Sequence, residues 1–84
     1  MITNISYDPA NNEILVTYTG SPDEMEIQAT PDGTTNWQTI YHDVPTNSFP
    51  NPLPDGDYQI KGRESDRGTT GPWSGNFSVH IDPD

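Results

Sequence analysis

Short stretches in which hydrophobic and polar residues alternate run through the whole chain, separated by residues that favour turns. Alternation with a period of two places one face of a segment against a core and the other toward solvent, which is typical of a β-strand. Residues 13–19 have this pattern from Ile14 onward, and residues 24–30 have Met25, Ile27 and Ala29 on one face. Both stretches are predicted to be half-buried strands.

Prolines and glycines interrupt the chain too often for a helix. There are nine prolines and seven glycines, and no apolar run with helical spacing escapes them. Residues 65–71 are predicted to be a polar loop. About seven short strands at this spacing indicate an all-β, antiparallel sandwich, formed by a single domain over residues 1–84. The predicted strands are residues 2–7, 13–19, 24–30, 37–41, 48–49, 58–64 and 77–81.

The charge of the chain excludes two classes of partner. Thirteen Asp and Glu residues stand against three Lys and Arg residues, which gives a formal net charge of −10. Nucleic acid and anionic membrane surfaces both require clustered cations that are absent here. No apolar run approaches the ~20 residues of a membrane-spanning helix, so membrane insertion is not expected. The chain has no cysteine and therefore no disulfide.

Three motifs, taken in order, resemble those of a fibronectin type III domain. The second predicted strand ends in an aromatic residue, Tyr18, where the family usually has Trp. Residues 53–58 read Leu-Pro-Asp-Gly-Asp-Tyr, and residues 71–74 read Gly-Pro-Trp-Ser before the last strand. The resemblance implies an immunoglobulin-like or fibronectin type III β-sandwich. A tyrosine just after a tight turn, here Tyr58, can bury its ring and return its hydroxyl to nearby backbone.

Two residues depart from the family pattern. Gly62 and Glu64 occupy inward positions after Ile60, where the family usually has apolar or small residues. Gly62 is expected to mark a bulge or a close backbone approach. A lone buried carboxylate costs several kcal/mol, so Glu64 must lie near solvent or have a partner.

Aromatic and basic residues form the candidate binding site. Lys61 and Arg63 share the outward face of one strand, and the family resemblance implies that Arg63 stacks on Trp73 as a structural cation–π contact. Arg, Trp and Tyr also dominate the energetics of binding surfaces, so the functional alternative is an interaction patch. By simple alternation, Trp37 and Tyr41 share a face that is either core or part of this patch. The candidate binding residues are Trp37, Tyr41, Lys61, Arg63, Arg67 and Trp73.

No catalytic residues or cofactors are predicted. His42 and His80 are expected at the surface, and the carboxylates are scattered through turns rather than paired on one element. Asp55 and Asp57, with Asp43 as a third ligand, are a minor alternative as a calcium site, because Asp-Gly-Asp is also ordinary turn chemistry.

A small sandwich without site chemistry is expected to be a non-enzymatic structural or binding module, a step that rests on analogy. The chain begins just before its first predicted strand and ends just after its last, which leads us to expect a small virion protein. Such a protein would decorate a bacteriophage capsid, tail or baseplate through contacts with the virion lattice or with itself, and make a weak contact with a host-surface glycan or protein. The alternative is an extracellular spacer or carbohydrate- or protein-binding module excised from a bacterial enzyme or adhesin. A designed fibronectin-type binder is a third hypothesis, disfavoured by the irregular residues 47–54.

Overall fold

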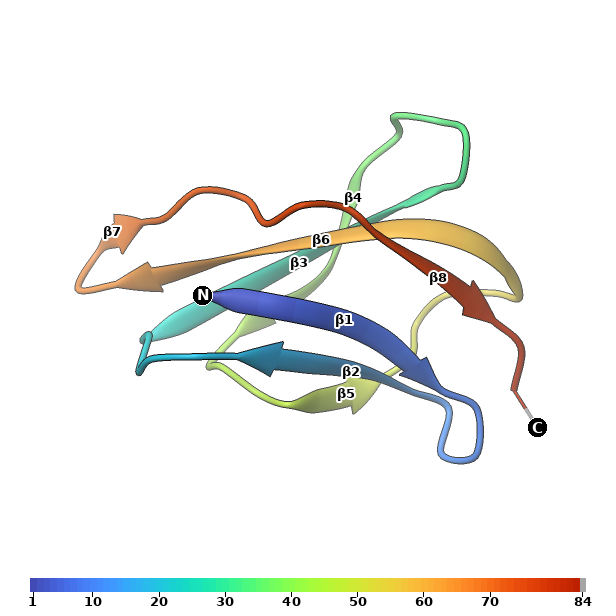
Figure 1. The fold of residues 1–84 in the computed structure, drawn as a ribbon, viewed down its shortest axis with the longest axis horizontal. Helices are drawn as coiled ribbons and strands as arrows, with labels where there is room; N and C mark the ends of the chain where they lie inside the picture. The colour runs from blue at the N-terminus through green and yellow to red at the C-terminus, as the bar shows by residue number, and fades with distance from the viewer. Residues whose placement is uncertain (84) are drawn as a thin grey trace.

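Two antiparallel sheets, without any helix, make up the computed structural model, which describes residues 1–83 (Figure 1). Among these residues there is no helix long and apolar enough to cross a membrane. The prediction of an all-β chain is therefore confirmed. The strands are β1 (Ile2–Asp8), β2 (Glu13–Tyr18), β3 (Glu24–Pro31), β4 (Gln38–Asp43), β5 (Ser48–Pro50), β6 (Gly56–Asp66), β7 (Thr69–Thr70) and β8 (Phe77–Ile81).

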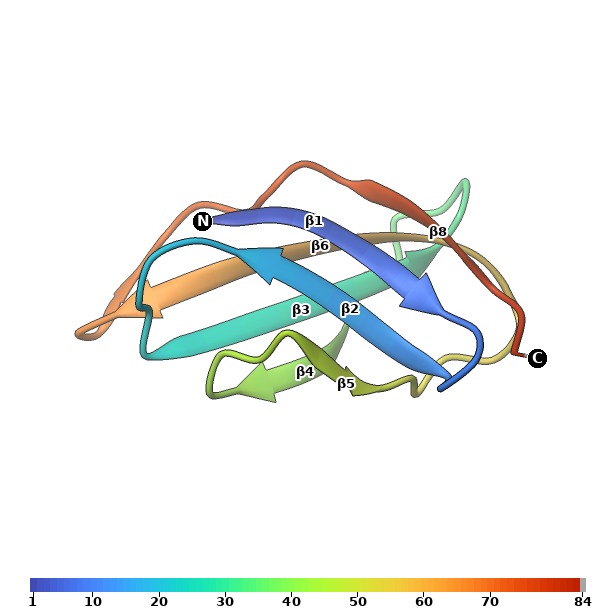
Figure 2. The same ribbon diagram turned by 60° about the horizontal axis from the view of Figure 1, so that its bottom comes forward.

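The sheets lie face to face in a sandwich-like arrangement. One sheet has three strands in the order β1-β2-β5, and the other has five, in the order β4-β3-β6-β7 with β8 also paired to β6. Figure 2 shows β1, β2 and β5 as one layer in front of β3 and β6. Where β1 runs beside β8 the two sheets come together. Within the larger sheet, the long strand β6 pairs with three other strands, β3, β7 and β8.

The predicted faces of the central strands are confirmed. Ile14 and Val16 of β2 are buried, as are Met25, Ile27 and Ala29 of β3. Burial of these aliphatic side chains between the sheets removes apolar surface from water and supplies the main drive for folding. The buried core also includes Ile2, Ile5, Phe49, Tyr58, Ile60, Val79 and Ile81.

Tyr58 adopts the conformation expected of a tyrosine after a tight turn. Its ring is buried, and its hydroxyl donates a hydrogen bond to the carbonyl oxygen of Pro54 at 2.8 Å. This bond fixes the chain before β6 to the start of that strand. Tyr18 lies at the margin of the core, half-buried and packed against it.

Gly62 allows two isoleucines to meet over β6. A Cβ atom at this position would lie 2.5 Å from Cδ1 of Ile2 and 2.7 Å from Cδ1 of Ile27. The pairing of β6 with β3 continues through Gly62 without a register shift, so no bulge is present in that ladder. The bulge alternative is therefore wrong, and the atoms that approach the Gly62 backbone most closely are side chains from both sheets.

The prediction of a polar loop over residues 65–71 is wrong. Strand β6 continues to Asp66 and turns directly into β7, with Ser65 opposite Thr70 and Asp66 opposite Thr69. The two residues between them, Arg67 and Gly68, have φ angles of 54° and 80°. A two-residue hairpin with positive φ at both positions matches the right-handed twist of its strands. Its first residue is usually Asn, Asp or Gly, so an arginine there gave no turn signal.

Candidate binding site

The candidate site lies on the outer face of the larger sheet. Lys61 and Arg63 alternate along β6 with the buried residues Ile60 and Gly62, so their side chains point away from the core. On the neighbouring strand β3, Gln28 lies opposite Lys61 and Glu26 lies opposite Arg63. Thr39 of β4 extends this row across the sheet, opposite Gln28.

Trp37 reaches this face from the end of the β3–β4 connection. That connection begins with a tight turn in which Gly33 has a φ of 81° and the Thr34 amide donates to the Pro31 carbonyl at 3.1 Å. Trp37 immediately precedes β4, and its ring lies under the Lys61 ammonium, with 4.2 Å between Nζ and the ring centroid.

Trp73 is positioned by a segment that follows β6 without forming a regular strand. The amide of Gly71 donates to the Glu64 carbonyl at 2.8 Å, and the amide of Ser74 donates to the Gly62 carbonyl at 2.7 Å. The hydroxyl of Ser74 accepts a hydrogen bond from the Gly62 amide at 3.0 Å, in place of a strand carbonyl. These bonds secure the backbone on both sides of Trp73.

The Trp73 ring lies close to both cations of β6. The Lys61 ammonium is 4.7 Å from its centroid, and the Arg63 guanidinium carbon is 4.3 Å from it. The expected contact of Arg63 with Trp73 is therefore confirmed. We refer to Trp37, Lys61, Trp73 and Arg63 as the ladder. All four residues are half-buried, so each also presents surface to solvent.

Glu26 anchors one end of the ladder. Its Oε1 atom accepts hydrogen bonds from Nε and Nη2 of Arg63 at 3.0 and 2.8 Å, and its Oε2 atom accepts one from the Thr39 hydroxyl at 2.8 Å. Burial alone would raise the pKa of Glu26, but the hydrogen bonds from Thr39 and Arg63 and the positive charge of Arg63 outweigh burial and lower it. Glu26 thus stays ionised and neutralises Arg63. Glu26 was not among the predicted binding residues, although its outward position on β3 was a usable signal.

Tyr41 is not part of this face, so the expectation that it shares a face with Trp37 is wrong. A β-bulge at Ile40 shifts the register of β4, which pairs Gln28 with Thr39 but Ile27 with Tyr41. The extra residue turns Tyr41 inward, where its ring stacks on Phe49 with centroids 4.7 Å apart. Burial, with help from the nearby Asp43 carboxylate, raises the pKa of Tyr41.

Arg67 also lies outside the ladder. It occupies the turn between β6 and β7, where its backbone amide donates to Oδ2 of Asp23 at 2.8 Å. Its side chain is exposed at that end of the molecule. Arg67 is close to Arg63 in sequence but lies away from the ladder, because β6 continues to Asp66, away from Trp73, before the chain turns.

The structure does not assemble the calcium ligands considered from the sequence. Oδ1 of Asp57 accepts a hydrogen bond from Nδ1 of His80 at 2.6 Å, while Asp43 lies at the other end of the sheet, opposite Met25. Within residues 1–83 no group of three or more His, Asp or Glu side chains is arranged to hold a metal ion. The hydrogen bond and the charge of Asp57 raise the pKa of His80. Both histidines are exposed, as predicted.

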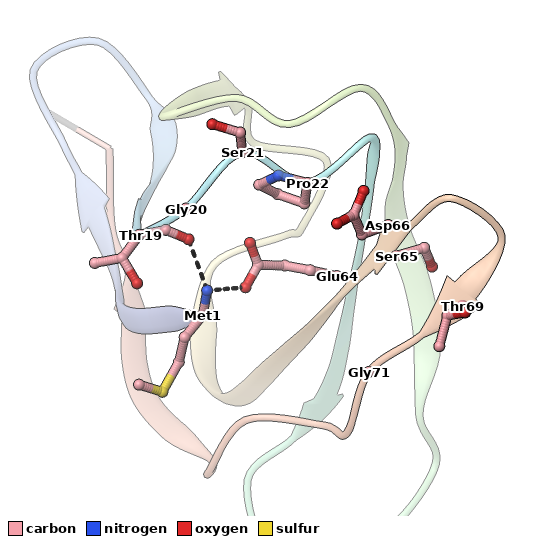
Figure 3. A pocket seen from close by; sticks show the side chains of 10 residues that line it. All are labelled: Met1, Thr19, Gly20, Ser21, Pro22, Glu64, Ser65, Asp66, Thr69 and Gly71. Atoms are coloured by element: carbon pink, nitrogen blue, oxygen red, sulfur yellow. Dashed lines mark hydrogen bonds and ion pairs between the residues drawn. The ribbon is translucent and has the colours of Figure 1, made fainter.

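A separate hollow of about 420 Å³ lies at one end of the sandwich, between the start of β1, the β2–β3 turn and the end of β6 (Figure 3). In it, Oε1 of Glu64 forms an ion pair with the α-ammonium group of Met1, which also donates to the Thr19 carbonyl at 2.7 Å. Glu64 therefore has the partner that its inward position requires. Its Oε2 atom is buried without a hydrogen-bond partner, and the exposed Asp66 at the end of β6 also lines the hollow.

Comparison with known proteins adds no relative to this description. No protein-family model matches the chain, and a search of curated proteins finds no match.

Proposed function

We propose that this chain is a non-enzymatic, fibronectin type III-like module that binds a protein partner through the ladder face. The family assignment is supported by the strand orders β1-β2-β5 and β4-β3-β6 with β8 beside β6. It is also supported by the hydrogen bond from the Tyr58 hydroxyl to Pro54. In such modules one sheet face is free to serve as a contact surface.

The arrangement of Lys61 between two indole rings carries the proposal. Its ammonium lies 4.2 Å from the Trp37 centroid and 4.7 Å from the Trp73 centroid. Cation–π contacts hold these three side chains in one conformation before any partner arrives. Binding then costs little further side-chain entropy, and tryptophan and arginine are the residue types on which protein interfaces most depend.

We further propose that the module is displayed in many copies on a large particle, such as a bacteriophage virion. A four-residue ladder gives a small contact area, and a small contact gains strength mainly through repetition and effective concentration. The acidic surface supports an exposed position, since high net charge favours solubility.

Sedimentation of the native source tests the location. The chain should travel with particles far larger than 9.3 kDa at a fixed copy number. Recovery of the chain only at its monomer size, or only within a longer polypeptide, would remove the virion proposal and favour a spacer or an extracellular module.

Photo-crosslinking within the same fractions tests the face. A photoreactive amino acid replaces Asn36, which is exposed and directly precedes Trp37 of the ladder, and in a matched variant it replaces Thr17, which is exposed on β2 of the other sheet. We expect a defined adduct from the Asn36 position and none from the Thr17 position. Equal adducts, or an adduct from Thr17 alone, would contradict binding through the ladder face.

A further inference from the structure

Lys61 differs from the other two cations of the chain in how its charge is balanced. Arg63 is paired with Glu26 through two hydrogen bonds, and Arg67 projects into solvent from a hairpin turn. Lys61 makes no ion pair with any carboxylate of the described residues, and its ammonium is held over two indole rings. Indole rings attract a cation but do not neutralise it. The ladder therefore presents one partly desolvated, uncompensated positive charge.

We propose that Lys61 binds a single carboxylate, an Asp or Glu side chain of the protein partner. Trp37 and Trp73 would then pack against the partner's apolar atoms on either side of that carboxylate. The inference rests on the function proposed above and specifies the chemistry of the partner.

Charge complementarity favours one carboxylate over a polyanion. Because Glu26 already neutralises Arg63, the face offers one free positive charge, and the surrounding surface contributes to a net charge of −10. A phosphate-rich or sulfate-rich ligand would meet that negative field, whereas one carboxylate can form a charge-assisted hydrogen bond with the ammonium. The half-buried indoles reduce the access of water to that bond, which strengthens it.

The two tryptophans provide a direct measurement. They are the only tryptophans in the chain, and both contact Lys61, so intrinsic fluorescence and the two indole N–H signals in NMR report on the ladder alone. The probe is a capped pentapeptide with one glutamate beside a phenylalanine, and its control is the same peptide with glutamine in place of that glutamate. Both are titrated to millimolar concentration.

We expect the glutamate peptide to shift both indole signals and to bind about tenfold or more tightly than the glutamine peptide, as for a hydrogen bond to a charged group. Lys61→Met should abolish the difference while its apolar chain keeps the rings apart, and Lys61→Arg should retain most of it. Arg67→Asn removes the same charge outside the ladder and should leave the binding of both peptides unchanged. Circular dichroism confirms that each variant is folded.

Equal binding of the two peptides, no binding of either, or full binding by Lys61→Met would overturn the carboxylate proposal. So would indole shifts caused by soluble oligosaccharides and not by the glutamate peptide, which would identify the rings as a sugar platform. These results are distinct from a failure of the proposed function. An Asn36 crosslink in native particles together with equal peptide binding would reject only the carboxylate, whereas absence of that crosslink would reject the face itself.

Discussion

The hydroxyl of Tyr58 donates to the carbonyl oxygen of Pro54, 2.8 Å away and four residues earlier in the chain. The tyrosine ring is buried, so the bond links the turn before β6 to the core. In Tyr58→Phe the Pro54 carbonyl loses this donor, and we expect a loss of about 1 kcal/mol of unfolding free energy, measured by urea denaturation. Tyr18→Phe is the matched control, because no hydrogen bond of the Tyr18 hydroxyl is present among residues 1–83. An equal loss in both variants would mean that the Pro54 bond adds nothing specific.

Gly62 is required by the two isoleucine methyl groups that would lie 2.5 and 2.7 Å from a Cβ atom there. We expect Gly62→Ala to cost about 1–3 kcal/mol of stability, as for an overpacked core. Adding Ile2→Val removes one of the two clashing methyl groups, so the double variant should lose less than the sum of the single variants. Gly75→Ala, with nothing within 4 Å of its Cβ position, should be nearly neutral. Additive losses in the double variant would exclude the clash with Ile2.

Arg67 adopts a φ of 54° in the two-residue turn between β6 and β7. Asparagine tolerates this conformation several-fold better than most residues. Arg67→Asn should therefore raise the unfolding free energy, measured by thermal denaturation, by up to about 1 kcal/mol. This value corresponds to the several-fold preference of asparagine for positive φ. Arg67→Val should do the opposite, because a β-branched side chain is strained at positive φ. A stabilised valine variant would contradict the turn.

His80 and Asp57 give the protein a pH-dependent contact at the surface. The hydrogen bond that His80 donates to the Asp57 carboxylate raises the pKa of His80 above 6.5, so the NMR titration midpoint of His80 should fall in Asp57→Asn and stay unchanged in the distant Asp43→Asn. Because the folded-state pKa is the higher one, the stabilisation is fully present below 6.5 and is lost as the pH rises through that raised pKa. A His80 midpoint unaffected by Asp57→Asn would show that the contact with Asp57 does not stabilise the protonated form of His80.

Much of the fold follows from the period of two in the sequence. Met25, Ile27 and Ala29 face the core as predicted. A strand that is buried on one face has alternating apolar and polar residues, so its orientation can be inferred from its own sequence. No pattern in the sequence around Ile40 indicates the bulge there. The bulge depends on the register between β4 and β3, so alternation assigned Tyr41 to the wrong face.

The candidate site was predictable to the extent that it lies on one strand. The outward positions of Lys61 and Arg63 follow from Ile60 and Gly62 beside them. The contacts of Lys61 with Trp37 and of Arg63 with Glu26 depend on β3 lying between β4 and β6. Strand order is set by packing of the whole chain, and a local pattern does not contain it.

The pairing of β3 with β6 also determines how the chain must fold. Glu24 lies opposite Ser65 and Pro31 opposite Tyr58. This strand pairing therefore forms only when the intervening chain, with β4 and β5, has closed into a loop. Closure costs entropy before any contact repays it, and folds dominated by such distant pairings take about milliseconds to seconds to form. Apolar strands are exposed throughout that interval. The net charge of −10 then has a kinetic role, because mutual repulsion keeps chains with unclosed loops from associating with one another.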